Sequence, residues 1–272
     1  MMSDAVRASG VVTLTTDFGH KGPYVATMKG AILRRFEGAT IVDLTHETSV
    51  YFPAEAGFWL SRSFRYFPDG TVHVAVVDPG VGTERDILVA TAERHFFVAP
   101  DNGLLAPVLA GCAGARVFRV SSRCFDNIGV LTRRISRTFH GRDILAPIAA
   151  ELASHRLRAE DVGPPVESIV PSWVDDPQVL EGRVSGVVIA VDHFGNLISN
   201  IDEALLAGMK HPRVRAGGHE LGMRATYGDA KPGEYLALVN SFGVVEIARA
   251  EQSAAEGLGL ERGAPIVVHD AG

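Results

Sequence analysis

Residues 74–85, VAVVDPGVGTER, constrain the fold of this chain more than any other stretch. Three of the first four residues are valine, which favours a buried strand with other layers packed on both faces. The strand leads directly into Asp78, and the proline and glycines that follow predict a tight turn before Arg85. Open α/β sheets present reactive groups in this way, with a carboxylate where a buried strand ends. Taken alone, however, these residues are explained more simply by a salt bridge that fastens the loop.

The first half of the chain alternates strand-like and helix-like segments. We expect strands over residues 11–16, 39–44, 87–92, 95–100 and 116–120, in addition to the strand that ends at Asp78. We expect helices that open at Gly22-Pro23, over residues 53–64, just after Asp101-Asn102-Gly103 and over residues 144–152. This alternation predicts a largely parallel sheet with helices on its faces.

The pattern changes after residues 164–176, a segment with three prolines and no clean periodicity. Beyond it, short β-type runs follow one another with little helix between them, over residues 184–191, 213–215, 223–227, 235–239, 244–249 and 266–269. Such runs are typical of a small β-barrel or sandwich. We therefore expect an N-terminal α/β domain of residues 1–165, a linker of residues 166–181 and a C-terminal β domain of residues 182–272.

The overall composition argues against several classes of partner. A net charge of −6 disfavours nucleic acid and anionic membranes, and the group Arg133, Arg134 and Arg137 is typical of a solvated loop. The two cysteines stand in no CxxC or Cys/His pattern, so neither a zinc site nor a disulfide scaffold is expected. No stretch of about 18 apolar residues occurs, and the first residues contain no apolar signal region. These features predict a soluble protein of the reducing cytoplasm.

Two further polar positions stand at the borders of predicted elements. Asp17 lies between a strand and a helix, where it could meet a ligand hydroxyl or simply cap the turn. His140 lies in RTFHGRD, just ahead of Asp143, which is expected to cap the helix over residues 144–152. A helix N-terminus favours an anion. A lone histidine is more often structural than catalytic, but one in this position, in a chain with an Asp/Arg loop, is a better candidate.

Six motifs, read in order, resemble those of one enzyme family. They are TLTTDFG, VDPGVGTER, APDNGLL, TFHGRD, DHFGNLISN and NSFGVVEIA. In them the chain is similar to the S-adenosyl-L-methionine (SAM) hydroxide adenosyltransferases, which hydrolyse SAM to adenosine and are related to the SAM-dependent fluorinase and chlorinase. The resemblance implies a Rossmann-like α/β domain followed by a small β-barrel domain. It also implies a homotrimer in which each ligand site is shared between two subunits.

The resemblance places the family's Asp-Arg-His triad on Asp78, Arg85 and His140. The chemistry is consistent with these residue types, because methionine leaves as a neutral thioether and needs no acid, whereas water is a poor nucleophile. Arg85 can stabilise hydroxide character, and His140 can accept or relay a proton. Asp78 can orient water and hold the arginine. The sequence leaves open which of the three is the formal base.

Further positions match residues that bind the ligand in the family. Asp17 resembles the carboxylate that holds the two ribose hydroxyls, and Tyr51 an aromatic residue that packs on the ligand near the sulfonium. Asp192 matches the partner of the methionine ammonium, and Ser241 the partner of its carboxylate. Asn196 matches the amide that reads the adenine edge.

Some positions depart from the family pattern or match it less well. Arg249 aligns with a residue on the adenine side. The fluorinase has a tyrosine and a serine near its halide, where this chain has Asp78 and Gly141, and a glycine at the second position resembles the chlorinase. Phe242 replaces an arginine of the fluorinase, and the long fluorinase insertion is not evident between Arg85 and Phe97. An anionic Asp78 would repel halide and favour water.

We therefore expect a SAM hydrolase that forms adenosine and L-methionine by attack of hydroxide at C5′. SAM is then the substrate, and no cofactor, metal, nucleic acid or membrane is needed. A SAM-dependent halogenase is the alternative within the enzyme class. A non-catalytic protein that binds SAM or adenosine is the alternative outside it.

Overall fold

The computed structural model describes residues 6–129 and 135–271, so Arg133 and Arg134 lie outside the described residues. The chain divides into two compact units between Trp173 and Val174. The short strand Gln178–Leu180 (β7) lies within residues 166–181, the segment expected to link the domains, and pairs with the first long strand of the second unit. Each unit has its own hydrophobic core and is described separately.

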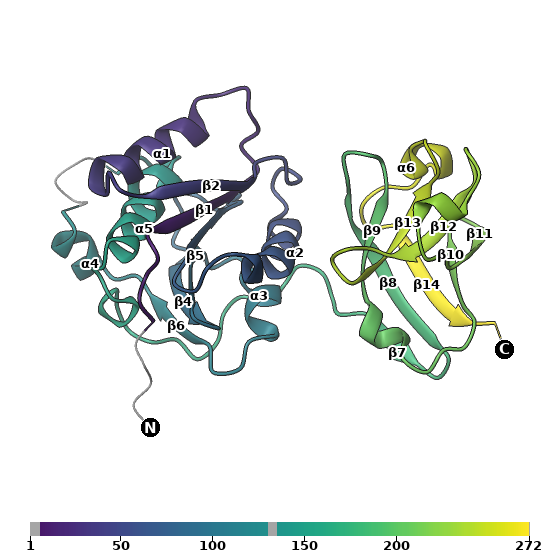
Figure 1. Ribbon diagram of the computed structural model, residues 1–272. Helices are drawn as coiled ribbons and strands as arrows, with labels where there is room; N and C mark the ends of the chain where they lie inside the picture. Colours follow the sequence, from purple (N-terminus) through teal and green to yellow (C-terminus); the bar gives the residue numbers. More distant parts are fainter. Residues whose placement is uncertain (1–5, 130–134, 272) are drawn as a thin grey trace. The chain divides into compact units, whose positions relative to one another are not determined.

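The first unit is built on a six-stranded sheet (Figure 1). In spatial order its strands are β2 (Thr40–Thr45), β1 (Val11–Thr16), β3 (Val72–Val76), β5 (His95–Pro100), β4 (Ile87–Ala92) and β6 (Arg116–Arg119). Its helices are α1 (Tyr24–Arg35), α2 (Pro53–Ser63), α3 (Ala106–Ala110), α4 (Ser122–Asn127) and α5 (Ala146–Ala153), with short 3₁₀ turns at Phe64–Tyr66 and Ala159–Asp161. The predicted largely parallel sheet is confirmed. Strand β4 is the exception, because it forms an antiparallel hairpin with β5 and also pairs antiparallel with β6.

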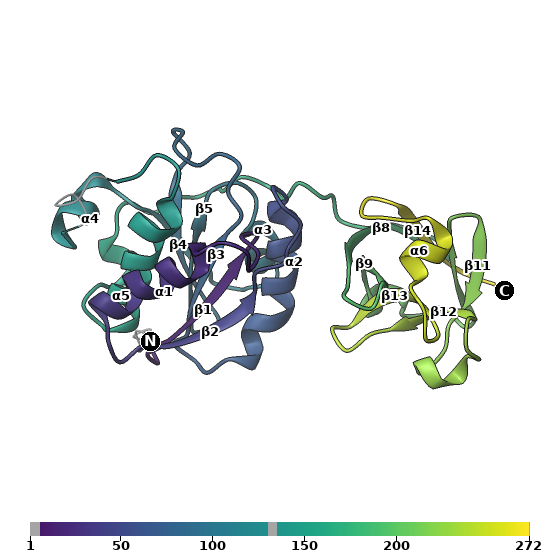
Figure 2. The same ribbon diagram turned by 90° about the horizontal axis from the view of Figure 1, so that it is seen from above.

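Helices cover both faces of this sheet, as Figures 1 and 2 show, with α1 and α5 on one face and α2 and α3 on the other. Residues 74–77 at the end of β3 show why this run has no polar side. Val74 and Val76 pack into the core under α1 and α5, whereas Ala75 and Val77 pack into the core under α2 and α3. A strand buried on both faces is therefore apolar at every position from Val74 to Val77, directly before Asp78.

The strand order places two predicted acidic residues side by side. Chain connections run outward from β1 in both directions, so the crevice at the carboxyl ends of β1 and β3 is the switch point of the sheet. Thr16 pairs with Val76 in the β1–β3 ladder. Asp17 and Asp78 follow these strand ends, and the loop after β2 opens at the same edge. The sheet therefore brings the two carboxylates together.

The predicted cap of the helix over residues 144–152 is wrong in detail. The helical segment begins earlier, with a π-helical turn over Gly141–Leu145, and His140 occupies the position before it. Asp143 lies inside this turn, where its carboxylate accepts the Ser136 backbone N–H at 2.8 Å and pairs with Arg142. It therefore fastens the preceding loop instead of capping the helix. Single π-turns of this kind are frequent at functional sites.

The second unit is an antiparallel sheet that curls toward a barrel. Its strands follow the order β11 (His219–Gly222), β10 (Pro212–Ala216), β14 (Pro265–Asp270), β8 (Arg183–Val191), β9 (Leu197–Asp202), β13 (Val244–Arg249) and β12 (Tyr235–Val239). It also contains the short helix α6 (Ala254–Leu258) and 3₁₀ turns at Glu203–Leu206 and Tyr227–Asp229. An isolated bridge between Met223 and Ala237 links the two ends of the strand order. The expected α/β unit followed by a small β-barrel-like unit is thus confirmed.

The strand expected over residues 223–227 is wrong. After the single bridge at Met223 the chain turns away, because Thr226 and Asp229 form a reciprocal capping box around a 3₁₀ turn. The Thr226 hydroxyl accepts the Gly228 N–H, and the Asp229 carboxylate accepts the Thr226 N–H at 2.9 Å. Local side-chain bonds therefore replace the sheet ladder at this point.

Among the residues that the structure describes, no helix is long and apolar enough to cross a membrane. Cys112 and Cys124 are both free and buried. Within the same residues, no group of three or more His, Cys, Asp or Glu side chains is arranged to hold a metal ion.

Candidate active site

The three residues of the predicted triad meet at the carboxyl edge of the first sheet. Arg85 holds Asp78 with two nitrogens, Nε at 2.8 Å from Oδ1 and Nη2 on Oδ2, and the pair is nearly removed from solvent. The same Nη2 lies 3.1 Å from Nδ1 of His140. A bidentate arginine with both partners fixed has little freedom to move. Arg85 is therefore the link that joins a carboxylate to an imidazole.

This contact determines the tautomer of His140. Burial lowers the pKa of His140 below its usual value, and the positive charge of Arg85 lowers it further. The ring is therefore neutral near pH 7, with one donor and one acceptor nitrogen. Arginine can only donate, so Nδ1 is the acceptor and Nε2 carries the proton. A proton delivered to His140 has to arrive at Nδ1, the atom that Arg85 contacts.

Asp17 lies across the crevice and holds the loop that carries Tyr51. Its Oδ2 accepts the backbone N–H of Tyr51 at 3.0 Å. Burial raises the pKa of Asp17, and the negative charge of Asp78 acts in the same direction. Tyr51 has a left-handed backbone (φ 63°) and a 70% exposed side chain. A non-glycine residue in this conformation is strained, and such strain is concentrated at functional sites.

Four of the predicted residues line one cleft of about 310 Å³, within the range of small-molecule sites. They are Asp17, Tyr51, Asp78 and His140. The remaining walls are apolar or aromatic and come from Phe18, Tyr24, Val50, Val76, Val81 and Phe139, with Thr138 and Gly141. The cleft thus combines an aromatic surface with two carboxylates and an imidazole.

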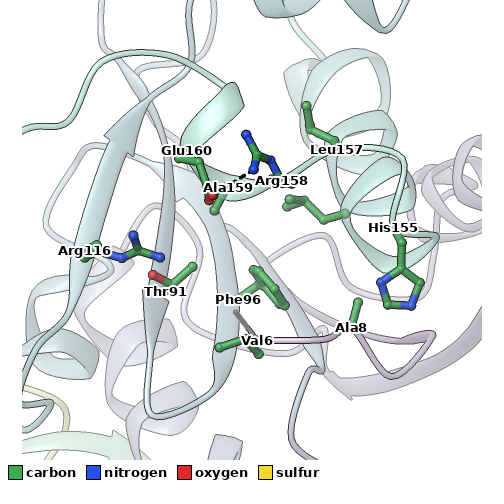
Figure 3. A pocket seen from close by; sticks show the side chains of 11 residues that line it. Val6, Ala8, Thr91, Phe96, Arg116, His155, Leu157, Arg158, Ala159 and Glu160 are labelled. Atoms are coloured by element: carbon green, nitrogen blue, oxygen red, sulfur yellow. Dashed lines mark ion pairs between the residues drawn. The ribbon is translucent and has the colours of Figure 1, made fainter. Parts of the chain in front are cut away.

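Another hollow in the first unit offers a contrast. It measures about 110 Å³, and Figure 3 shows Phe96 in its middle, with Arg116 and Thr91 on one rim and His155 on the other. Arg158 on its wall is paired with Glu160 at 3.7 Å. Because this charge is already compensated and the hollow is about a third of the size of the cleft, it is the weaker candidate for a ligand site.

In the second unit, Asp192 and Asn196 form one tightly bonded turn. Asp192 Oδ1 accepts the Asn196 backbone N–H at 2.8 Å, and its Oδ2 accepts the Asn196 side-chain amide at 2.9 Å. One amide hydrogen of Asn196 is thus already engaged. Ser241 is exposed in the turn between β12 and β13, which follows Asn240.

Strand register separates Arg249 from this pair. Side chains of directly paired residues point to the same face of a sheet. Register places Asp192 and Asn196 on the same face as Ala248, so Arg249 points to the opposite face. There it lies over the Tyr235 ring at 4.9 Å and donates to the Gly233 carbonyl at 3.0 Å. Its role on the adenine side stays a prediction.

Several residues that shape these sites were not predicted from the sequence. Phe18, Tyr24 and Phe139 form an aromatic cluster with ring centroids 5.6–5.9 Å apart, on the cleft wall. Two of them directly adjoin Asp17 and His140, a signal that could have been used. In the second unit, Glu246 is buried inside β13, and a charged residue within the apolar run VVEIA was the available signal.

These features define a two-unit α/β enzyme whose reactive groups lie at the switch point of a parallel sheet. The SAM hydroxide adenosyltransferase N-terminal domain matches residues 12–163, and the C-terminal domain of that name matches residues 186–267. The chain belongs to the SAM hydroxide adenosyltransferase family.

Curated relatives are similar over nearly the whole chain. The (R)-S-adenosyl-L-methionine hydrolase of Thermus thermophilus is 36% identical over 259 residues, which is 94% of this chain and 98% of the relative. That of Salinispora arenicola is 36% identical over 242 residues, 87% of this chain and 89% of the relative. The fluorinase of Actinopolyspora mzabensis is 28% identical over 303 residues, covering 98% and 99%. The family resemblance is thereby confirmed.

A solved structure has the same fold. The crystal structure of a conserved protein from Thermotoga maritima superposes with a TM-score of 0.84 at 35% identity, covering 95% of this chain and 99% of that one.

Proposed function

We propose that this chain hydrolyses S-adenosyl-L-methionine to adenosine and L-methionine, by attack of water-derived hydroxide at C5′. The observation that carries the proposal is Arg85, held between the buried carboxylate of Asp78 and the acceptor nitrogen of His140. The hydrolases among its relatives, at 29–36% identity, are also closer in sequence than the fluorinases, at 27–28%.

The reaction needs a nucleophile more than it needs an acid. The C5′–S bond breaks with both electrons going to sulfur, so methionine leaves as a neutral thioether, and the new C5′–O bond takes its electrons from the water oxygen. The water proton passes to Nδ1 of neutral His140, which gives up the hydrogen bond from Arg85 as it takes the proton. The Arg85 N–H that is released then stabilises the developing hydroxide. Asp78 holds Arg85 in place. Its negative charge also disfavours a halide at the same position.

Isotope labelling tests this function directly. In ¹⁸O-water containing chloride, the label is expected in the 5′-hydroxyl of adenosine, in equal amount to methionine. Unlabelled adenosine would rule out attack by solvent, and a 5′-chloro product would assign the chain to the halogenases. We propose that no cofactor or metal takes part, so full activity is expected after EDTA treatment. Loss of activity that re-added metal restores would refute this.

The relatives are named for the (R) epimer of the sulfonium. We extend this preference to the present chain. Separate incubation with (R)- and (S)-SAM, with adenosine measured in each, tests it. Equal rates would refute the extension without affecting the proposed hydrolysis.

Binding and chemistry are expected to separate by mutation. Asp17→Ala and Asp192→Ala each remove contacts to parts of SAM that do not react, the ribose and the methionine ammonium in this proposal. A charge-assisted hydrogen bond contributes about 1.5–3 kcal/mol, so the affinity for SAM is expected to fall roughly ten- to hundred-fold. Calorimetric titration measures the affinity, and kcat at saturating SAM is expected to change much less. A large loss of kcat with unchanged affinity would contradict these assignments.

We further propose a cytoplasmic homotrimer in which Asp17, Asp78, Arg85 and His140 of one subunit act with Asp192, Asn196 and Ser241 of a neighbour. Asp78→Ala subunits are mixed with Asp192→Ala subunits under exchange conditions, at a SAM concentration too low to fill the weakened Asp192→Ala sites. Activity is then expected to rise above that of either variant alone, because some sites receive two intact halves. Sites closed within one chain predict no recovery, since every chain carries a lesion. Each variant alone, taken through the same exchange, is the control, and light scattering gives the assembly size.

A further inference from the structure

Glu246 is a buried carboxylate that the proposed reaction does not use. It lies in the middle of β13 and is only 2% exposed, between the buried Val245 and Ile247. Both of its oxygens are engaged. The Tyr227 hydroxyl donates to Oε1 at 2.7 Å, and Nδ2 of Asn240 donates to Oε2 at 3.1 Å. A carboxylate in such a site is retained at a cost in desolvation, which an apolar residue would avoid.

The hydrogen bond from Asn240 ties Glu246 to the turn that carries Ser241. Oδ1 of Asn240 accepts the backbone N–H of Phe242 at 2.9 Å and of Val244 at 3.3 Å. These bonds fix the amide orientation, so Nδ2 has to face the carboxylate. Glu246 thereby holds the turn and the Tyr227 ring in one arrangement. The ring itself stays half-exposed.

Strand register places Glu246 on the same face of the sheet as Asp192. Glu246 pairs with Ile198, and Ile198 pairs with Ala190, so these three residues share one face. Asp192 is two residues beyond Ala190 and therefore points to that face as well. Burial raises the pKa of Glu246, and the negative charge of Asp192 acts in the same direction. The carboxylates of Asp192 and Glu246 thus lie on the same face of the sheet, with Asp192 partly accessible to solvent and Glu246 buried.

We propose that Glu246 is a positioning residue for SAM binding, which fixes the Ser241 turn and adds a second negative charge behind Asp192 for the methionine ammonium. This inference rests on the proposed function, because it assumes that SAM is the ligand. It assigns to Glu246 no contact with the ligand. A buried charge acts through the low-dielectric interior and is screened less by solvent than an exposed one.

Glu246→Gln separates the charge from the hydrogen bonds. The glutamine oxygen can accept from Asn240, and the Tyr227 hydroxyl can rotate to accept from the new amide, so the arrangement is kept. The probes are SAM and the SAM analogue that lacks the α-amino group. Both are titrated calorimetrically in a His140→Ala background, in which SAM is expected to be consumed much more slowly. The affinity for SAM is expected to fall about five- to ten-fold, while that for the analogue changes less than about two-fold.

Glu261→Gln, an exposed position in the same unit, is the matched control for net charge and is expected to change neither affinity. Tyr227→Phe removes a hydrogen bond but leaves the carboxylate, so the ratio of the two affinities is expected to stay as in the parent. Tyr227→Phe also tests the proposal if Glu246→Gln fails to fold. If this variant lost the difference in affinity between SAM and the analogue while keeping the carboxylate, the role of charge would be overturned.

An equal loss of affinity for both ligands in Glu246→Gln would show that Glu246 has only a structural role and would overturn the proposal. Unchanged affinity for both ligands would overturn it as well. Failure of the proposed function is a different result. If SAM binds but the unmutated chain forms no adenosine, hydrolysis is refuted while the affinity ratio still decides the role of Glu246. If SAM does not bind at all, both are overturned.

Discussion

Arg85→Ala is expected to lower kcat by about 10²- to 10³-fold while SAM still binds. Arg85 donates to Asp78 and to Nδ1 of His140 with the same guanidinium, so its loss removes the group that stabilises hydroxide character. Losses of this size are typical when one preorganised donor to a developing negative charge is removed. Because the stabilisation arises mainly in the transition state, kcat and kcat/KM are expected to fall together.

The buried partner complicates this variant. The side chain of Asp78 is only 4% exposed, so Arg85→Ala leaves a carboxylate without its counter-charge, at a cost of about 3–5 kcal/mol in stability. The double variant Asp78→Asn/Arg85→Ala removes both charges and is expected to fold better yet remain as inactive. Arg85→Lys keeps the charge but cannot make the bidentate contact, so partial activity is expected.

The measurement is single-turnover adenosine formation, together with calorimetric titration of SAM and a urea denaturation curve for each variant. His140→Ala is the companion variant, expected to lower turnover with little change in affinity. Near-normal kcat in a folded Arg85→Ala protein would show that the arginine only fastens the loop. That outcome would restore the simpler explanation of the residue pair.

The order of strands and helices along the first unit was predictable because its central strands are buried on both faces and its strands end in recognisable turns. The acidic residue after β1 and the one after β3 are visible in the sequence, and parallel strands bring such ends together. What could not be predicted is the contact between Arg85 and His140, which lie 55 residues apart and meet only through the tertiary fold. The tautomer of His140 depends wholly on that contact.

Local chemistry also overrode periodicity in the second unit. The run that suggested a strand over residues 223–227 contains Thr226, and its reciprocal bond with Asp229 forms a turn instead. Glu246 and Arg249 lie three residues apart on one strand, so they belong to opposite faces. Which face meets the ligand depends on register, and register is set by pairing with β9 and not by the strand's own sequence.

The other large expected effect is on stability and concerns His73, a second buried polar residue in an otherwise apolar strand. His73 in β3 is fully buried under α2, where its Nδ1 lies 2.8 Å from the Thr13 hydroxyl and its Nε2 3.1 Å from Nδ1 of His95. The Phe97 ring stacks on it at 5.2 Å. Burial, with a smaller contribution from His95, lowers the pKa of His73 to about 3. The folded chain therefore excludes a proton that the unfolded chain takes up near pH 6.5.

The direction of the pH dependence of stability follows from this difference in pKa between the folded and unfolded states. Between pH 6.5 and 3 the unfolded state binds more protons than the folded state, so the free energy of unfolding falls as the pH is lowered. The contribution of neutral His73 to stability is fully present only above pH 6.5. Each pH unit in this window corresponds to about 1.4 kcal/mol for one group. At pH 5 the first unit is expected to have lost roughly 2 kcal/mol through His73 alone, while most carboxylates are still ionised.

His73→Gln is therefore expected to be less stable than the parent at pH 7, but to lose about 2 kcal/mol less between pH 7 and pH 5. Both tryptophans, Trp59 and Trp173, belong to the first unit, so urea denaturation followed by tryptophan fluorescence reports on the unit that contains His73. His20→Gln removes an exposed histidine of the same unit and is expected to keep the parental pH dependence. If the parent and His73→Gln lost equal stability over this range, the buried histidine would not be the group that sets the acid sensitivity of the fold.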